Sequence, residues 1–511
     1  MTDFQLEGHQ PLLKVEHHTK NFPHIIANDS ISFDVRKGEV HCLLGENGAG
    51  KTTLAECLYG FYKPDAGSII FNGKVLNLSS PRDAIRAGIG MVHQHFVLAP
   101  PMTVIENIVV GTEMKSVMVD LRTAAKKIMM LCENYGVEID PFEIISQLSV
   151  GQQQWVEILK ALYVGVELLI LDEPTAVLTP QESQKLFLIL KKMTQDGLSI
   201  ILITHKLHEV MSVSDRVTVL RKGKLVGTVN TNAVSREELA RMMVGRDVSF
   251  RVKKETFNPG VPILEIDNVH ALKENKTEAL CGFNLRIRMG EIVGLAGVAG
   301  NGQKELFDVV VGVGHPKSGQ VILNGEDITH LSPTAISAKG LASIPQDRIH
   351  EGLLMDFSIE ENLIAGLQRK SPFRKGILLN QLAINQFADQ AINDYDITAS
   401  SPQQKAKTLS GGNLQKVILA REFSQKPKCV IASSPTRGLD VGAMEYVYQR
   451  LVALQKAGAG ILLISEDLDE IFNISDTIAV IFRGKIMGVF NVDEVNKERI
   501  GLLMAGIQES N

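Results

Sequence analysis

The chain has 511 residues, of which 44% are hydrophobic and 22% charged, and its formal net charge is -5. This length is greater than that of one ordinary domain, and the composition is that of a folded protein rather than a disordered one. The mildly acidic balance argues against a nucleic-acid-binding protein, for which a strongly basic domain is the usual footprint. The five cysteines are far apart and form no CxxC pair, which favours reduced thiols in a cytosolic protein over a disulfide or zinc framework.

Nothing in the sequence predicts a segment that enters a membrane. The first residues lack the charged and then apolar pattern of a secretory signal. No apolar run approaches the roughly 18 residues that a membrane-spanning helix needs. If the protein serves a membrane, we expect other chains to span it.

The first strong signal is a phosphate-binding pattern after a predicted strand. Residues 40–44 form an apolar run that ends at a glycine, which is typical of a buried strand in a parallel sheet. The following residues fit GxxxxGK[ST], in which loop amides wrap phosphate oxygens, Lys51 reaches the β- and γ-phosphates and Thr52 offers a hydroxyl to Mg²⁺. A chance glycine-rich turn is the alternative. The predicted ATP-binding residues here are Gly45, Glu46, Asn47, Gly48, Ala49, Gly50, Lys51, Thr52 and Thr53.

Further along the chain, a helical segment and an acidic strand are predicted. Residues from about 117 to 165 combine helical spacing with charges and predict a helical insertion in the sheet domain. Residues 168–171 are a second apolar run, and it ends in two acids. Asp172 is expected to hold Mg²⁺ and Glu173 to orient or deprotonate the attacking water. A pair of solvated turn carboxylates is the alternative.

Three other residues become candidate site residues when they are considered together with the phosphate loop and the acidic strand. Gln94 is predicted to join the metal to the water, His205 to contact the γ-phosphate, and Phe22 to stack on adenine. Each has an ordinary alternative: a surface glutamine, a capping or core histidine, and a core aromatic. Together with Lys51 and Glu173, the residues Gln94 and His205 make up the predicted catalytic set, and Gln94 joins the predicted metal ligands.

The chain also contains an internal repeat. The tripeptide at 38–40 recurs at 290–292, the glycine-rich loop at 45–53 recurs at 297–305, and residues 148–149 recur at 409–410. Between the last two features the second half is nine residues longer. Such self-similarity predicts two homologous domains, residues 1–250 and 262–511. The polar stretch 251–261, which contains a Pro-Gly turn signal, is the predicted linker.

A short motif then identifies a family. Residues 148–152 read LSVGQ, lie 20 residues before the acidic strand and resemble the LSGGQ signature of ATP-binding cassette (ABC) proteins. Residues 409–413 read LSGGN and form a second copy. The resemblance covers nearly the whole chain, and this order of motifs is very specific. It implies an α/β fold of two tandem P-loop ABC nucleotide-binding domains, each a RecA-like α/β core with an inserted helical subdomain.

The resemblance also implies a mechanism with ATP and Mg²⁺ as cofactors. In this family two cassettes pack head to tail, and each ATP lies between one phosphate loop and the opposite signature. ATP closes the pair and hydrolysis reopens it, which moves membrane subunits docked on the helical insertions. The residues of the second half that the resemblance assigns to the ATP of the first half are Ser410, Gly411, Gly412, Asn413 and Asp440.

The second half departs from the family pattern at its own nucleotide site. In place of the phosphate lysine, the metal ligands, the base, the histidine and the aromatic residue it has Gln303, Lys304, Ser433, Ser434, Glu466 and Glu274. In the signature that would face this altered loop, Val150 replaces a glycine, and Thr179 stands where the second half has Asp440. Since all departures fall in one composite site, we expect one hydrolytic site and one site kept for structure, regulation or unproductive nucleotide binding.

Fused cassettes with a degenerate second site look like the ATPases of sugar and nucleoside importers. Residues 92–98 and 300–303 are more similar to the nucleoside branch, and a ribose- or galactose-type importer is the alternative. The resemblance implies two transmembrane permease subunits, an extracytoplasmic solute-binding lipoprotein and a peripheral position on the cytoplasmic face of the cell membrane. The cassettes would pair within one chain or between a pair of such chains.

Two rival functions remain at this point. A soluble translation factor with twin cassettes usually has a long charged linker and two intact sites, whereas this chain has a short joint and one altered site. A non-hydrolysing scaffold would suit the second half alone. The complete set in the first half argues against it for the whole chain.

Overall fold

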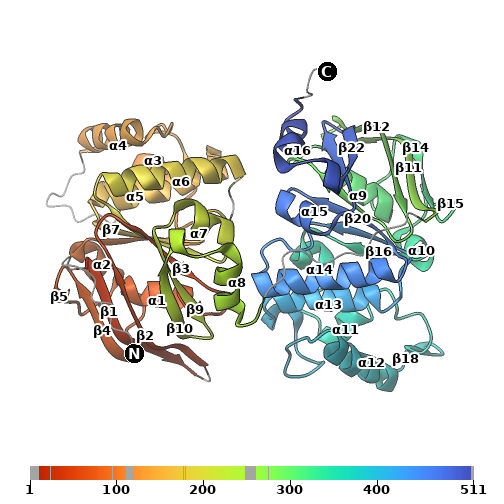
Figure 1. Cartoon of the computed structure of the whole chain (residues 1–511), viewed down its shortest axis with the longest axis horizontal. Coiled ribbons are helices and arrows are strands. Elements are labelled where there is room, and N and C mark those ends of the chain that lie inside the picture. Colours follow the sequence, from red (N-terminus) through yellow and green to blue (C-terminus); the bar gives the residue numbers. More distant parts are fainter. Residues whose placement is uncertain are drawn as a thin grey trace. The chain divides into compact units, whose positions relative to one another are not determined.

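A computed structural model describes residues 11–247 and 260–507, apart from residues 24, 95, 111–119, 177, 179 and 274 and the side chains of 180 and 181 (Figure 1). The chain divides into two compact units, Met1–Val248 and Ser249–Asn511, and each is described by itself. Residues 251–259 of the predicted linker lie outside the described ranges.

Unit 1 is built on two sheets. A four-stranded antiparallel sheet has the order β2-β1-β4-β5, and a six-stranded sheet has the order β10-β9-β3-β8-β7-β6, in which all strands but β10 are parallel. The strands are β1 (Leu13–Phe22), β2 (Ile25–Val35), β3 (Val40–Leu44), β4 (Ala66–Phe71), β5 (Lys74–Val75), β6 (Ile89–Val92), β7 (Leu168–Asp172), β8 (Ser199–Thr204), β9 (Arg216–Arg221) and β10 (Lys224–Asn230).

The helices of unit 1 cover the faces of the larger sheet. Helix α1 packs between the two sheets, because its Leu54 and Leu58 share a buried cluster with Leu13 of β1 and Ile170 of β7. The helices are α1 (Lys51–Leu58), α2 (Pro81–Ala87), α3 (Val104–Val109), α4 (Leu121–Tyr135), η1 (Ile145–Gln147), α5 (Val150–Val164), α6 (Pro180–Gln195), α7 (Leu207–Val213), η2 (Thr231–Ala233) and α8 (Arg236–Val244).

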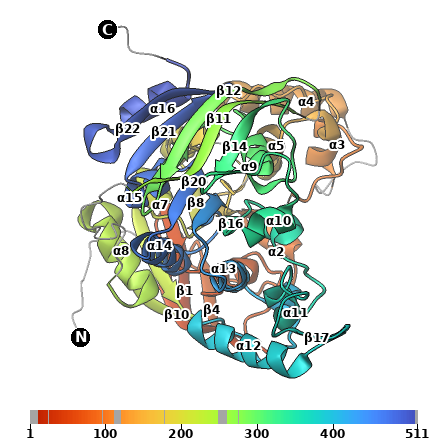
Figure 2. The same ribbon diagram turned by 90° about the vertical axis from the view of Figure 1, so that its right-hand side faces the viewer.

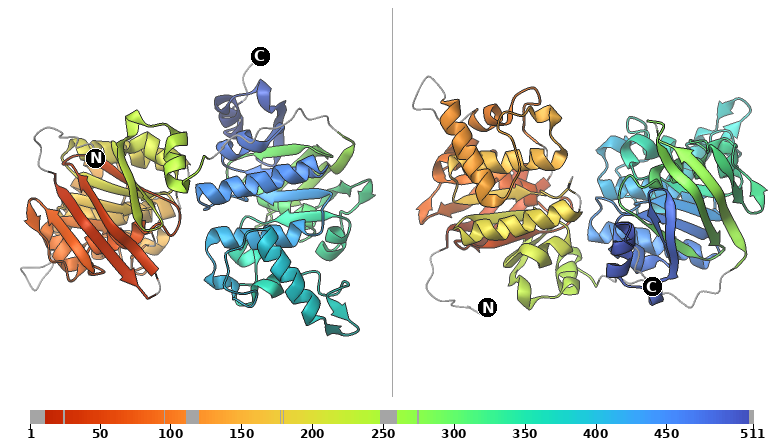
Figure 3. Two further views of the ribbon diagram at one scale, coloured as in Figure 1. Left: turned by 60° about the horizontal axis from the view of Figure 1, so that its bottom comes forward. Right: turned by 90° about the horizontal axis from the view of Figure 1, so that it is seen from above.

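The predicted helical insertion is present and begins earlier than expected. Helices α3, α4 and α5 have their own buried cluster, with Ile105, Ile128 and Leu159 at its centre. Figure 3 shows these helices, orange to yellow, to one side of the sheets of unit 1. Helix α3 opens with a capping box between Thr103 and Glu106, a start signal upstream of the predicted boundary at about residue 117.

Unit 2 repeats this architecture. Its sheets have the orders β12-β11-β14-β15 and β16-β19-β20-β13-β21-β22 (Figure 2). A two-stranded hairpin, β17-β18, lies in the segment that is longer than its counterpart in unit 1. The strands are β11 (Pro262–Leu272), β12 (Glu278–Arg288), β13 (Ile292–Ala296), β14 (Ser318–Leu323), β15 (Glu326–Asp327), β16 (Leu341–Ile344), β17 (Arg374–Lys375), β18 (Leu378–Leu379), β19 (Cys429–Ser433), β20 (Gly460–Ser465), β21 (Thr477–Phe482) and β22 (Lys485–Asn491).

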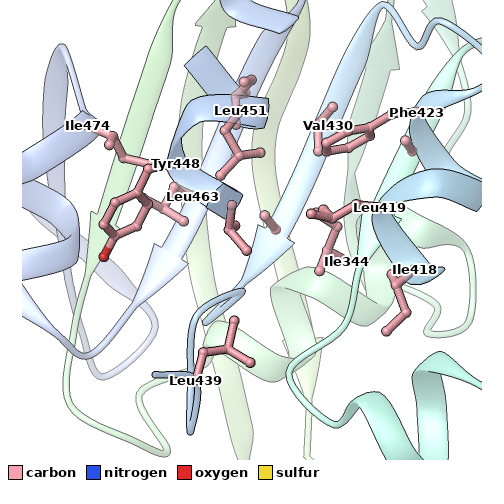
Figure 4. Close-up of a cluster of buried hydrophobic side chains, with 14 of the residues drawn as sticks. Ile344, Ile418, Leu419, Phe423, Val430, Leu439, Tyr448, Leu451, Leu463 and Ile474 are labelled. Atoms are coloured by element: carbon pink, nitrogen blue, oxygen red, sulfur yellow. The ribbon is translucent and has the colours of Figure 1, made fainter. Parts of the chain in front are cut away.

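The largest buried cluster of unit 2 lies between its parallel sheet and the helices after it. Figure 4 shows Leu419 and Phe423 of α13 facing Val430 of β19, while Tyr448 and Leu451 of α14 fill the neighbouring part. The helices are α9 (Gln303–Val311), α10 (Pro333–Ala338), η3 (Arg348–Gly352), α11 (Ile359–Leu363), α12 (Gln381–Asp394), η4 (Ala406–Thr408), α13 (Gly411–Phe423), α14 (Val441–Lys456), α15 (Leu468–Ile474), η5 (Val492–Glu494) and α16 (Lys497–Met504).

All five cysteines are free thiols, and four of them are buried. Among the described residues, no helix has the length and apolar character needed to span a bilayer.

Candidate active site

The predicted catalytic residues of unit 1 follow four neighbouring strands. The parallel strands β3, β8, β7 and β6 stand in that order in the sheet, so their carboxyl ends meet at one edge. The phosphate loop follows β3, His205 follows β8, Glu173 follows β7, and Gln94 lies two residues beyond β6. Ligands of open α/β sheets bind at this edge.

The phosphate loop requires glycine where the backbone is crowded. A Cβ at Gly45 would lie 2.4 Å from the carbonyl oxygen of Leu220, and Gly50 has φ 93°. Lys51, at the start of α1, folds back over the loop and donates from Nζ to the carbonyl oxygens of Gly45 at 2.8 Å and Glu46 at 2.9 Å. The loop therefore curls around the lysine ammonium, which is the shape that presents its amides and this positive charge to a phosphate.

Asp172 and Thr52 offer oxygens to a metal ion. Asp172 is 2% exposed, and its Oδ1 has no hydrogen-bond partner among the described residues. Burial raises the pKa of Asp172 to about 6, while a hydrogen bond from Thr52 acts in the opposite direction. A buried carboxylate oxygen without a partner beside a hydroxyl fits Mg²⁺, which uses one or two protein oxygens and takes its remaining ligands from phosphate and water.

Glu173 is held between two other predicted site residues. Its Oε1 lies 2.7 Å from Nδ1 of His205, and its Oε2 accepts a hydrogen bond of 3.3 Å from Nε2 of Gln94. Burial acts to raise the pKa of Glu173, but the hydrogen bond and charge of His205 outweigh it and lower the pKa. Glu173 is therefore an ionised carboxylate in a fixed position, as a general base must be.

The backbone at Glu173 is in the left-handed region. Its φ is 46°, which is costly for a residue with a side chain, and its amide donates to the carbonyl oxygen of Ile203 at 3.0 Å. Ser434 in unit 2 has φ 41° and donates to Ile464 in the same way at 2.7 Å. Unit 2 thus keeps the backbone conformation that Glu173 has in unit 1 and lacks its carboxylate.

The glycine-rich loop of unit 2 is closed by its own side chains. Gln303, which stands where unit 1 has Lys51, donates from Nε2 to the carbonyl oxygen of Val298 at 3.0 Å and accepts at Oε1 from the amide of Asn301 at 3.1 Å. Lys273 donates from Nζ to the carbonyl oxygen of Gly300 at 2.7 Å. A neutral carboxamide replaces the ammonium, and it also binds a backbone amide of the loop, the kind of group with which phosphate loops bind phosphate.

The signature segments of the two units differ in how the serine caps the helix that follows it. In unit 1, Ser149 caps α5 by accepting from the amide of Gln152 at 3.3 Å, in a reciprocal capping box. In unit 2, Ser410 makes no such cap and accepts instead from Nδ2 of Asn413 at 2.9 Å. Within the described part of unit 2, no acceptor is recorded for the first three amides of α13. They remain able to bind an anion at a helix N-terminus.

The remaining predicted residues have simpler surroundings. The Phe22 ring packs edge-on against Tyr62, with centroids 5.2 Å apart, at the end of β1. Asp440 caps α14 by accepting from the amide of Ala443 at 2.9 Å. Thr179 and Glu274 lie outside the described residues. A role for Phe22 or Asp440 at a bound nucleotide stays a prediction.

A buried network behind the site was missed by sequence reasoning. In unit 1, Glu209 accepts from Thr175 and Thr204 and lies 3.2 Å from Nζ of Lys206. The i,i+3 spacing of Lys206 and Glu209 is a recognisable signal for this pair. The network fixes the segment after Glu173 against the segment after His205.

Unit 2 has kept the buried acid of this network and lost its cation. Glu470 is 1% exposed and accepts from Thr436 at 2.5 Å, but Asp467 stands where unit 1 has Lys206. Burial, with repulsion from Asp467 as a smaller contribution, raises the pKa of Glu470 to about 7. The folded state therefore favours the protonated acid, and the resulting stability is fully present below about pH 4.5 and is lost as the pH rises through 7.

The Glu470→Gln variant is expected to be more stable than the wild type at pH 8 and little changed at pH 5. A rise in pKa from 4.5 to about 7 costs the charged form on the order of 3 kcal/mol, equivalent to a rise in Tm of about 8 °C. Thermal unfolding at both pH values measures it. The matched variant Glu209→Gln should lower Tm at pH 8, because it removes the carboxylate that pairs with the ammonium of Lys206. Stabilisation by both variants would contradict this explanation.

The fold and the site define a P-loop ATPase with two cassettes. The chain belongs to the ABC transporter family, whose model matches residues 28–176 and 280–437. Both matches include a signature segment and the strand before the catalytic position, β7 in unit 1 and β19 in unit 2. As an ATP-binding member of this family, the chain is an ATPase.

Several characterised relatives match nearly the whole chain. The nucleoside import ATP-binding protein NupA of Lactococcus lactis subsp. cremoris (strain MG1363) is 45% identical over 96% of this chain and 97% of its own length. The guanosine import ATP-binding protein NupO of Bacillus subtilis (strain 168) is 46% identical over 95% of this chain and 96% of its own. The glucose import ATP-binding protein TsgD13 of Haloferax volcanii is 44% identical over 97% of this chain and 96% of its own.

Proposed function

We propose that the chain is the ATP-hydrolysing subunit of a nucleoside importer and that one composite site performs all of its hydrolysis. This site combines the phosphate loop of unit 1 with the signature of unit 2. The observation that carries the proposal is that unit 1 has the better phosphate loop and base, whereas unit 2 has the better signature. Unit 1 has the ordered base and a phosphate loop that holds the ammonium of Lys51, whereas unit 2 has the uncapped signature helix and a loop that holds the neutral carboxamide of Gln303.

The chemistry follows from the contacts of Glu173. Its ionised carboxylate accepts a proton from the attacking water, whose oxygen bonds to the γ-phosphorus while the bond to the β–γ bridging oxygen breaks, giving ADP and phosphate. His205 and Gln94 hold the two carboxylate oxygens in position. Lys51 and the amides of the loop and of α13 stabilise the charge that develops on the phosphoryl oxygens.

The metal proposed for this site is Mg²⁺, held by Thr52, Asp172 and Gln94. Its contribution, when bound, is to neutralise charge on the β- and γ-phosphate oxygens. Unit 2 offers Lys304 and Ser433 where unit 1 has Thr52 and Asp172, so it lacks a carboxylate for the ion. We therefore propose that unit 2 binds no Mg-ATP.

The solute is assigned from the relatives. NupA and NupO are named as nucleoside and guanosine import proteins, and each is at least 45% identical to this chain over nearly its whole length. A sugar importer is the alternative, favoured by the 44% identity to a glucose import protein. All three are import ATP-binding proteins, which leaves the twin-cassette translation factor without support.

Importers of this kind imply partners that this chain does not supply. We propose two transmembrane permease subunits, an extracytoplasmic solute-binding lipoprotein and a peripheral position on the cytoplasmic face of the membrane. No role with nucleic acid is proposed, since the net charge is -5.

The test is ATP hydrolysis by the complex reconstituted in vesicles with its permeases and binding protein. Guanosine or another nucleoside inside the binding-protein compartment should stimulate hydrolysis and accumulate on the opposite side. Ribose and glucose at the same concentration should do neither. Stimulation by a sugar alone would overturn the nucleoside assignment and leave the ATPase assignment intact.

A further inference from the structure

The hairpin β17-β18 of unit 2 exposes an unusual group of apolar side chains. Ile377 at its turn is 92% exposed, the highest value for a large apolar side chain in the described part of the chain. Leu378 and Leu379 of β18 are 71% and 55% exposed, and Leu382 at the start of α12 is 71% exposed. We call these four residues the apolar tip. Figure 2 shows β17 projecting beyond α11 and α12 within unit 2.

The base of the hairpin is firmly packed. Phe373 is 7% exposed, and its ring stacks edge-on against Phe387 of α12 with centroids 5.1 Å apart. The amide of Asn380 donates to the carbonyl oxygen of Phe373 at 2.8 Å, and its side chain donates to Pro372 at 3.1 Å. A small buried cluster thus lies directly beneath the tip, yet the tip residues do not join it. The hairpin is therefore an ordered part of unit 2, and its tip is exposed in the folded structure.

Four cations precede the apolar tip in the chain, and we call them the basic collar: Arg369, Lys370, Arg374 and Lys375. All four are exposed, and none has an ion pair recorded among the described residues. Arg374 pairs with Leu379 and Lys375 with Leu378 across the hairpin, so each rung places a cation beside a leucine on the same face. Long cationic side chains can follow an inserting apolar group and keep their charge at a polar boundary.

We propose that this hairpin binds the surface of an anionic lipid bilayer, with the apolar tip among the acyl chains and the basic collar at the headgroup phosphates. Exposed apolar residues next to unpaired cations are the combination that favours such an interface. A protein partner fits less well, because a stable protein interface needs about 20–30 residues on each side. The proposal rests on the proposed function only in that an importer ATPase works at a membrane.

The test is flotation of the full-length chain with vesicles of phosphatidylcholine alone or mixed with phosphatidylglycerol. The wild type should float with the anionic vesicles and less with the neutral ones, and added salt should weaken binding. Arg374→Gln with Lys375→Gln should weaken it about 25-fold, since each cation at an anionic surface contributes a factor of about five. Ile377→Ser with Leu378→Ser and Leu379→Ser should weaken it at least about tenfold.

Leu188→Ser on α6 is the matched control. Leu188 is 71% exposed, as Leu378 is, and its loss should leave flotation unchanged. ATP hydrolysis by every variant should match the wild type, which separates lipid binding from the catalytic proposal. The lipid proposal is overturned if the wild type does not float, or if the hairpin variants float as the wild type does. Loss of assembly with the permease subunits in place of loss of flotation would overturn it in favour of a protein contact.

Discussion

Glu173→Gln is expected to reduce steady-state ATP hydrolysis by about 10²–10⁴-fold, the usual cost of losing a positioned base. The amide keeps the size of the side chain and can still meet His205 and Gln94, but it cannot accept the proton of the attacking water. The effect should therefore fall on turnover rather than on ATP affinity. The measurement is hydrolysis by the reconstituted complex, with nucleotide binding measured in parallel.

The control for this variant lies at the equivalent position of unit 2. Ser434→Glu places a carboxylate on the same left-handed backbone, yet it should change hydrolysis little. The loop of unit 2 still has Gln303 in place of the phosphate lysine and Ser433 in place of the metal ligand. Near wild-type hydrolysis by Glu173→Gln would mean that unit 2 hydrolyses ATP by another route.

Gly411→Val is expected to reduce hydrolysis by about 10²–10³-fold, the range seen when one anion-stabilising donor is lost from an active site. This change copies into unit 2 the valine that unit 1 has at position 150. The nearest atom to a Cβ at Gly411 is Nη1 of Arg348 at 3.9 Å, so the fold should tolerate the side chain. Its branched methyl groups would cover the amides of α13 that we assign to the γ-phosphate.

Val150→Gly is the reciprocal variant. It restores a glycine to the signature of unit 1, where Ser149 already caps its own helix with Gln152. Hydrolysis should stay within about twofold of the wild type, since we propose that this signature serves the loop that contains Gln303 in place of the phosphate lysine. Equal losses from the two variants, or a gain from Val150→Gly, would contradict the head-to-tail assignment.

The elements that carry the chemistry could be predicted because they rest on local patterns. The phosphate loop is specified by glycines at fixed spacing after an apolar run, and the acidic strand by a buried run that ends in Asp172 and Glu173. Because the two halves of the chain are repeats, the fold predicted for one half also applied to the other. The different capping of Ser149 and Ser410 also had a signal in the sequence, since only the first is followed three residues later by glutamine.

Other features depend on tertiary contacts and have no sequence pattern that predicts them. The strands β17 and β18 have two residues each, too few for a periodicity, and the base of their hairpin is held by the packing of Phe373 on Phe387. The closure of the second loop by Gln303 requires the curled backbone of that loop to exist first. The raised pKa of Glu470 comes from burial, which a single sequence does not reveal.

The central claim is that one Mg-ATP site operates in each chain, and equilibrium binding of Mg-ATP to the Glu173→Gln chain tests it most directly. Because this variant should bind without hydrolysing, the nucleotide count reports sites rather than turnover. We expect saturation at one nucleotide per chain and loss of that binding after the further change Lys51→Ala. Saturation at two nucleotides per chain, or one that survives Lys51→Ala, would contradict it, because the loop of unit 2 would then hold ATP despite Gln303 and Ser433.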